Sequence, residues 1–127
     1  MIRVLLVDDE PMFLAALEAL LAADDRIDVV GKADSAAEAL AIAEEQHPDV
    51  ALVDLAMPGL DGFELTRRLL EERAAGHVLA VSGLTHERDA ERALEAGASA
   101  FLLKGGLYEE VADAIVAASE QPSQAGA

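Results

Sequence analysis

Five polar side chains directly follow short apolar runs of the sequence, and their types suit phosphoryl chemistry. They are two neighbouring acids, a third acid, a hydroxyl and a cation: Asp8, Asp9, Asp54, Ser82 and Lys104. Carboxylates that lie close together repel one another, and Mg²⁺, which prefers oxygen ligands, relieves that repulsion. A carboxylate beside Mg²⁺ can also act as a nucleophile toward phosphorus and form an aspartyl phosphate. An ammonium group and a hydroxyl then stabilise the phosphoryl oxygens.

The elements that position these side chains are predicted from hydrophobic periodicity. Five short apolar runs predict strands buried on both faces: 4–7, 27–30, 50–53, 78–81 and 100–103. The segments between them have helical spacing, so strands and helices alternate five times. This order predicts an α/β fold with a doubly wound parallel sheet. Ligands bind at the carboxyl edge of such a sheet, where we expect the five polar side chains to meet.

Local signals predict where helices begin and end. The candidate first residues and N-terminal caps are Pro11, Ser35 with Glu38, Asp61 with Glu64, and Thr85. Gly97 is expected to close the helix that Thr85 begins. Periodicity is lost from Glu120 onward, which predicts a domain over 1–119 and a flexible tail or linker over 120–127.

Composition narrows the possible functions. The chain has 127 residues, which suits one domain, and a net charge of −16 at pH 7. That charge disfavours binding to phosphate backbones and to anionic membranes. Hydrophobic residues make up 53%, too many for a disordered acidic tail. The chain has no cysteine, which excludes thiolate chemistry and fits a cytoplasmic location. We expect no targeting or membrane-spanning segment, because every apolar run is short.

The motifs, in this order and spacing, resemble the receiver domain of bacterial two-component response regulators. The matching segments are 7–10, 54–62, 82–83 and 101–104 within residues 2–119. The resemblance implies a flavodoxin-like sheet of five parallel strands in the order 2-1-3-4-5, with helices on both faces. The stretch 29–33 and the choice of Ser82 resemble a subfamily usually fused to a C-terminal helix-turn-helix DNA-binding domain.

The resemblance also implies roles at the site. Asp54 is the expected phosphoacceptor, and Lys104 is expected to pair with the phosphoryl group. The expected Mg²⁺ ligands are Asp8, Asp9, Asp54 and the backbone carbonyl of Ala56.

The resemblance further implies a regulatory switch that is not an enzyme in its own right. Ser82 and Phe101 are the expected switch residues. The implied partners are a sensor histidine kinase and, on phosphorylation, a second copy of the chain. The output is expected to be transcriptional. This acidic segment is not expected to bind nucleic acid itself, although a fused DNA-binding domain is compatible with it.

Two positions depart from the family pattern. Gly105 and Gly106 follow Lys104, where the family usually has a proline in a cis peptide. Glycine restrains the backbone less, so this loop is expected to be looser or differently shaped. Ala56 places a small side chain where a larger one is common, which is expected to leave the phosphoryl pocket open to solvent.

Other interpretations stay open at this point. The chain could be a receiver-like binding module that acts without phosphorylation, because the loop departs from the pattern. An aspartate-nucleophile phosphohydrolase is disfavoured, since such enzymes need an acid where Ala56 stands. Asp61 is more simply a helix cap than a ligand, and Phe101 could be an ordinary core residue. His47, His77 and His86 are scattered and are expected at the surface.

Overall fold

A computed structural model of the chain describes residues 1–57, 61–83 and 87–123. Strands and helices alternate through them, as predicted. The strands are β1 (Ile2–Val7), β2 (Ile27–Ala33), β3 (Val50–Asp54), β4 (His77–Ser82) and β5 (Ala100–Leu103). The helices are α1 (Pro11–Ala22), α2 (Ala36–Gln46), α3 (Gly62–Glu71), α4 (Glu87–Glu95) and α5 (Leu107–Ser119), with a 3₁₀ turn over Lys104–Gly106. Within these residues no helix is long and apolar enough to cross a membrane.

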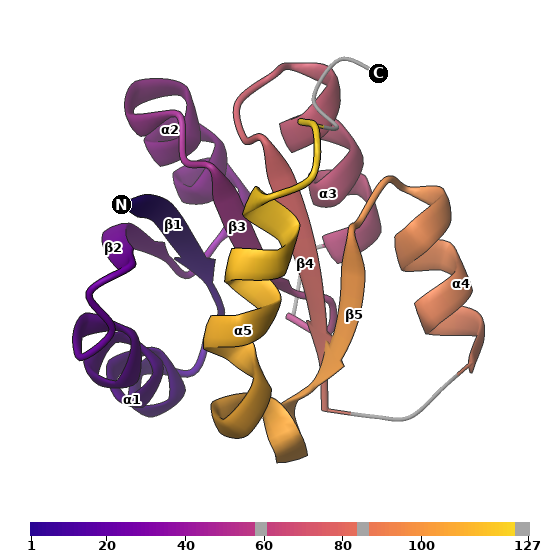
Figure 1. Ribbon diagram of the computed structural model, residues 1–127. Coiled ribbons are helices and arrows are strands. Elements are labelled where there is room, and N and C mark those ends of the chain that lie inside the picture. Colours follow the sequence, from indigo (N-terminus) through magenta and orange to yellow (C-terminus); the bar gives the residue numbers. More distant parts are fainter. Residues whose placement is uncertain (58–60, 84–86, 124–127) are drawn as a thin grey trace.

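The five strands form one parallel sheet in the order β2-β1-β3-β4-β5, which confirms the flavodoxin-like α/β fold. Helices α1 and α5 cover one face, and α2, α3 and α4 cover the other (Figure 1). Alternate side chains of β1 explain this division: Leu6 packs with α1 and α5, whereas Leu5 packs with α2 and α3.

Burial differs between the central and the edge strands. Every residue of β3 and β4 is buried, as expected for strands covered on both faces. The edge strands β2 and β5 are only partly buried. The prediction of strands buried on both faces is therefore wrong for β2 and β5, because an edge strand has a neighbour on one side only.

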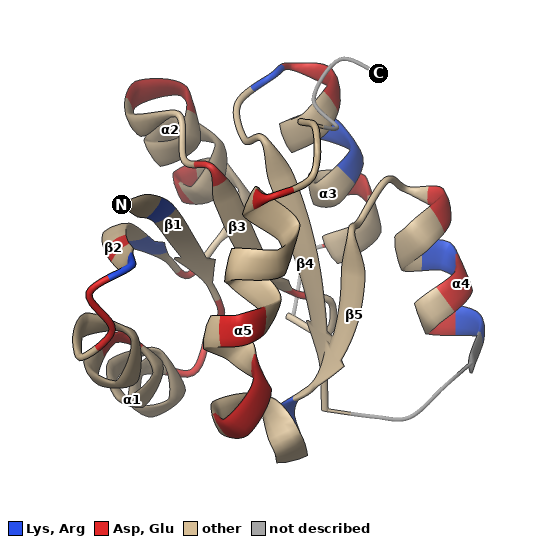
Figure 2. Ribbon diagram, in the orientation of Figure 1, with Lys and Arg blue, Asp and Glu red and all other residues tan. Residues whose placement is uncertain are grey.

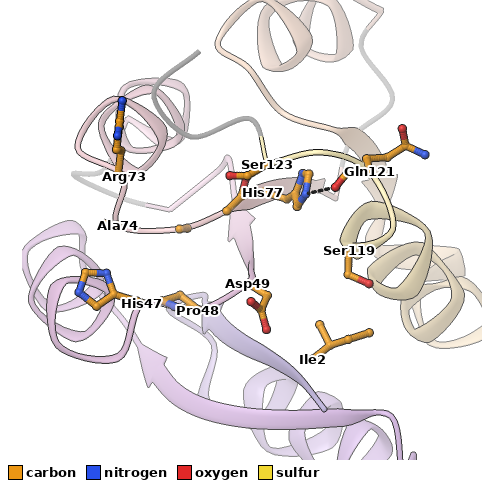
Figure 3. A pocket seen from close by; sticks show the side chains of 12 residues that line it. Ile2, His47, Pro48, Asp49, Arg73, Ala74, His77, Ser119, Gln121 and Ser123 are labelled. Carbon is orange, nitrogen blue, oxygen red and sulfur yellow. Dashed lines mark hydrogen bonds between the residues drawn. The ribbon is translucent and has the colours of Figure 1, made fainter.

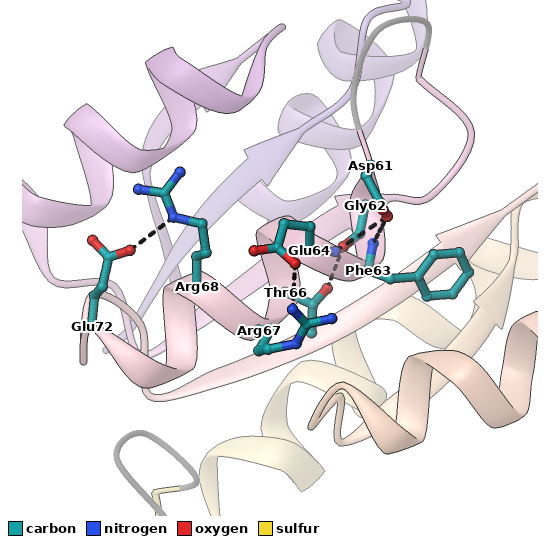
Figure 4. Close-up of polar contacts among 8 residues, drawn as sticks. All are labelled: Asp61, Gly62, Phe63, Glu64, Thr66, Arg67, Arg68 and Glu72. Carbon is teal, nitrogen blue, oxygen red and sulfur yellow. Dashed lines mark hydrogen bonds and ion pairs between the residues drawn. The ribbon is translucent and has the colours of Figure 1, made fainter.

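Three of the predicted helix starts can be checked. Pro11 is the first residue of α1, and Ser35 caps α2 by accepting a hydrogen bond from the Glu38 N–H at 3.2 Å. The Asp61 carboxylate accepts from the backbone N–H groups of Phe63 and Glu64 at the start of α3 (Figure 4). Asp61 is thus a helix cap, as its simpler interpretation predicted.

The end of α4 also follows its sequence signal. Gly97 has φ +109°, a backbone conformation that residues with a Cβ atom rarely adopt. It lies two residues after Glu95, the last residue of α4. Thr85, the predicted cap of this helix, lies outside the described residues.

The amino edge of the sheet holds a histidine that the sequence misplaces. His77 begins β4 and is only 3% exposed, so its predicted surface position is wrong. Its Nε2 contacts the carbonyl oxygen of Gln121, beyond the end of α5, at 3.2 Å (Figure 3). Its Nδ1 contacts Ser99 Oγ, also at 3.2 Å. His47 is exposed, as predicted. His86 lies outside the described residues.

Candidate functional site

The carboxyl edge of the sheet gathers acids from distant parts of the sequence. Asp8, Asp9 and Glu10 follow β1, and Asp54 ends β3. One carboxylate oxygen of each lies within 4.8 Å of the others. We call these four residues the acidic cluster. Because β1 and β3 are adjacent and parallel, with Val7 opposite Val53, their carboxyl ends deliver the acids to the same place.

Asp8 is the most deeply enclosed acid of the cluster, at 2% exposed. Its Oδ1 accepts a hydrogen bond from the Glu10 N–H at 2.9 Å. Its buried Oδ2 pairs with the Lys104 ammonium, which lies 2.9 Å away. Burial raises the pKa of Asp8, and the nearby charge of Asp54 adds to that rise.

Asp54 is also buried, at 3% exposed. Its Oδ1 accepts from the backbone N–H of Ala56 at 3.0 Å, which holds the carboxylate at the end of β3. Its Oδ2 lies 3.2 Å from Lys104 Nζ. Ala56 itself is exposed.

Lys104 opposes the acids as the cation of the site. Its Nζ lies 2.9 Å from Asp8, 2.8 Å from Glu10 and 3.2 Å from Asp54. Burial alone lowers the pKa of this ammonium group, but hydrogen bonds to the three carboxylates outweigh burial and raise it. Lys104 is therefore charged at neutral pH and compensates part of the repulsion among the acids.

The two predicted switch residues occupy different surroundings. Ser82 ends β4 and is 3% exposed, one residue beyond Val81, which lies opposite Asp54 in the sheet. Ser82 thus ends β4 at the same carboxyl edge of the sheet at which Asp54 ends β3. Phe101 lies in β5, half-buried, and packs with Ala80 and Ala93 between β4 and α4. The structure thus places Ser82 at the carboxyl edge of the sheet and Phe101 on the α4 side.

The turn after Lys104 has a shape of its own. Lys104, Gly105 and Gly106 form a 3₁₀ turn that runs directly into α5. Within the described residues no peptide bond is cis. A Cβ atom at Gly105 would meet nothing within 4 Å, so packing restrains this turn little.

Two residues at the site were not predicted for it. Glu10 joins the acidic cluster and pairs with Lys104, and Phe13 places its ring 4.5 Å from the Lys104 ammonium. Adjacency to Asp8 and Asp9 was the available signal for Glu10. Phe13 belongs to the apolar stripe of α1, and periodicity alone does not tell which residue of a stripe approaches the site.

The donor set fits a hard divalent cation. All ligand atoms that the cluster offers are carboxylate oxygens, and two of its acids, Asp8 and Asp54, are buried. Such a set suits Mg²⁺ better than a softer metal. The acidic cluster is thus of the kind typical of receiver-domain Mg²⁺ sites.

Comparisons with known proteins agree with this geometry. The profile of the response regulator receiver domain family matches residues 4–116. The chain is 40% identical over 120 residues to the transcriptional regulatory protein LiaR of Bacillus subtilis, covering 94% of this chain and 57% of LiaR. It is 42% identical over 115 residues to the response regulator GacA of Pseudomonas viridiflava, covering 91% of this chain and 54% of GacA. The chain thus spans about half the length of these relatives.

Solved structures show the same architecture. The response regulator domain of Thermotoga maritima CheB is 31% identical with a TM-score of 0.87, and the match covers 95% of this chain and 98% of that one. A LuxR-family two-component response regulator from Aurantimonas is 32% identical with a TM-score of 0.85, over 95% of this chain and 86% of that one.

Proposed function

The chain belongs to the response regulator receiver domain family, whose members are phosphoacceptor modules of two-component signalling. From this premise we propose that the chain is a switch phosphorylated on Asp54. The observation that carries the proposal is the convergence on Asp54: a buried carboxylate lies 3.2 Å from a lysine and within reach of three further acids. Burying a carboxylate beside other acids is unfavourable for stability, but such a carboxylate suits a nucleophile that works beside a cation.

The proposed reaction moves a phosphoryl group from the phosphohistidine of a sensor kinase to Asp54. A carboxylate oxygen of Asp54 forms a bond to phosphorus while the P–N bond breaks. The imidazole leaves with the bonding electron pair and takes up a proton. Ala56 N–H holds Oδ1 of Asp54, and Lys104 stabilises negative charge on the phosphoryl oxygens.

Mg²⁺ is the proposed cofactor. Asp8, Asp9, Asp54 and the backbone carbonyl of Ala56 would hold it, with Glu10 near enough to contribute. When bound, the ion supplies positive charge that neutralises both the acids and the incoming phosphoryl oxygens. Asp8 gains most from it, because its carboxylate is the most deeply buried of the cluster and lies near the charge of Asp54.

The proposed response to phosphorylation starts at Ser82. Its hydroxyl would bond a phosphoryl oxygen; Ser82 is buried at the end of β4, the strand next to the one that Asp54 ends, which supports this role. Phe101, on the neighbouring strand, then repacks between β4 and α4. This changes the affinity of the α4, β5 and α5 surface for a partner.

The proposed setting is bacterial two-component signalling in the cytoplasm. A sensor histidine kinase supplies the phosphoryl group, and phosphorylation favours a homodimer. Relatives described as transcriptional or LuxR-family regulators support a transcriptional output. The net charge of −16 disfavours DNA binding by this segment itself, so DNA contact would belong to a fused domain.

Mass spectrometry tests the proposal directly. Incubation with acetyl phosphate and Mg²⁺ should add the mass of one phosphoryl group to the wild type, and Asp54→Asn should abolish the adduct. Asp61→Asn is the matched control, because Asp61 is an acid of the same type that caps α3. An adduct that persists in Asp54→Asn would contradict the assignment. Failure of the wild type to form an adduct or to bind Mg²⁺ in calorimetry would favour a binding module that acts without phosphorylation.

A further inference from the structure

The Lys104 ammonium has an aromatic neighbour besides its acids. The ring of Phe13, in the first turns of α1, lies 4.5 Å from Nζ at its centroid, within the range of a cation–π contact. Its charged neighbours are carboxylates of the acidic cluster, from Asp8, Glu10 and Asp54. We infer that Phe13 is a positioning residue for Lys104, which keeps the ammonium at the mouth of the site when the acids are engaged elsewhere. The inference rests on the proposed function.

Mg²⁺ and Lys104 would compete for the same carboxylates, so a contact of Lys104 outside the acidic cluster matters. All three carboxylates that bind Lys104 belong to the cluster that would hold Mg²⁺. A divalent cation that draws on these oxygens weakens their hold on the lysine. The face of an aromatic ring does not ligate Mg²⁺, which prefers oxygen. The contact of Phe13 with Lys104 is therefore independent of metal binding.

The turn that carries Lys104 increases this need. Gly105 and Gly106 follow it, and a Cβ atom at Gly105 would have no neighbour within 4 Å. Backbone flexibility next to Lys104 is thus restrained little by the turn itself. The contact of the Lys104 ammonium with Phe13 in α1 restrains the lysine through its side chain instead.

Phe13 is itself well held. It lies one residue before the buried Leu14 and packs against the core between the sheet, α1 and α5. Its ring also meets that of Tyr108 in α5, with centroids 6.0 Å apart and planes tilted by 50°. This geometry lies in the range that aromatic pairs prefer. A ring fixed on two sides can hold a cation in one place.

Stepwise fluorination of the ring tests the inference at nearly constant shape. Fluorine withdraws charge from the ring face, so 4-fluoro-, 3,5-difluoro- and 3,4,5-trifluorophenylalanine at position 13 should weaken the cation–π contact in that order. We expect the rate of phosphorylation by acetyl phosphate with Mg²⁺ to fall in the same order, by about fivefold for the trifluoro variant. The Mg²⁺ affinity should stay unchanged, since Phe13 is not a ligand.

Phe63 is the matched control. Its ring also carries a cation, the Arg92 guanidinium at 3.9 Å from the centroid, but this pair joins α3 to α4 away from the acidic cluster. The same fluorinated series at position 63 should leave the phosphorylation rate unchanged. A parallel fall in both series would assign the effect to general packing and overturn the inference.

A spectroscopic readout does not depend on the reaction. Protons of the Lys104 side chain near a ring face are shifted upfield by its ring current, and Phe13→Leu should abolish that shift in metal-free protein. If the wild type forms no phosphoryl adduct, the proposed function fails and Phe13 has nothing to position. If the wild type is phosphorylated but the Phe13 series is flat, the inference alone fails.

Discussion

The two edges of the sheet are built from the same strands but treat their polar groups in opposite ways. At the carboxyl edge, four acids cluster together, and three of them, Asp8, Glu10 and Asp54, pair with the single cation Lys104. At the amino edge, polar groups are matched in pairs. The amino edge therefore favours stability, whereas the carboxyl edge keeps an electrostatic imbalance that a cation and a phosphoryl group can relieve.

Several polar groups at the amino edge have hydrogen-bond partners. Asp49 accepts from the backbone N–H of Arg3 at 2.8 Å, and the Arg3 guanidinium donates to Gln46 Oε1 at 2.7 Å. Ser123 Oγ donates to the Gly76 carbonyl oxygen at 3.3 Å (Figure 3). His77 Nε2 faces the Gln121 carbonyl, which can only accept, so Nε2 carries the proton. On the helix surfaces, Arg68 pairs with Glu72 on α3 (Figure 4), whereas α2 and α5 carry acidic but no basic residues (Figure 2).

The largest effect is expected from removing the cation of the carboxyl edge. Lys104→Met should slow phosphorylation by about 100-fold, the order seen when one charge-stabilising group is lost from a reaction site. The adduct should still form on Asp54, because the nucleophile is unchanged. Rapid-quench measurement with acetyl phosphate gives the rate. Lys32→Met is the control, since Lys32 pairs with Glu18 at the surface; equal slowing in both variants would contradict the role of Lys104.

The opposite result is expected at the amino edge. His77→Phe should lower the free energy of unfolding by about 2 kcal/mol, because it removes two hydrogen bonds of a buried ring. The phosphorylation rate should stay within a factor of about two, because the substitution changes no charge at the acidic cluster. Urea unfolding measures the first quantity, with the exposed His47→Phe as control. A tenfold loss of phosphorylation in His77→Phe would show that the two edges are not independent.

What the sequence predicts follows the same division. The carboxyl edge was predictable because each of its groups directly follows an apolar run, so parallel topology alone brings Asp8, Asp54 and Lys104 together. The burial of His77 was not predictable, because it depends on the path of the chain after α5. The contact of Phe13 with Lys104 depends on the rotation of α1, which an apolar stripe leaves undetermined.

The smallest of these effects is a gain in stability at the carboxyl edge. Burial raises the pKa of Asp8 above its ordinary value of 3.8, so the folded protein disfavours the charged form at neutral pH. Asp8→Asn should therefore raise the free energy of unfolding by about 1 kcal/mol at pH 7 without Mg²⁺. The gain should shrink as the pH falls through the raised pKa, and vanish below 3.8, where Asp8 of the wild type is protonated in both states. Urea unfolding of both proteins between pH 3 and pH 7 measures it, and added Mg²⁺ should reverse the order of stability, because it relieves the repulsion only where Asp8 is present to bind it.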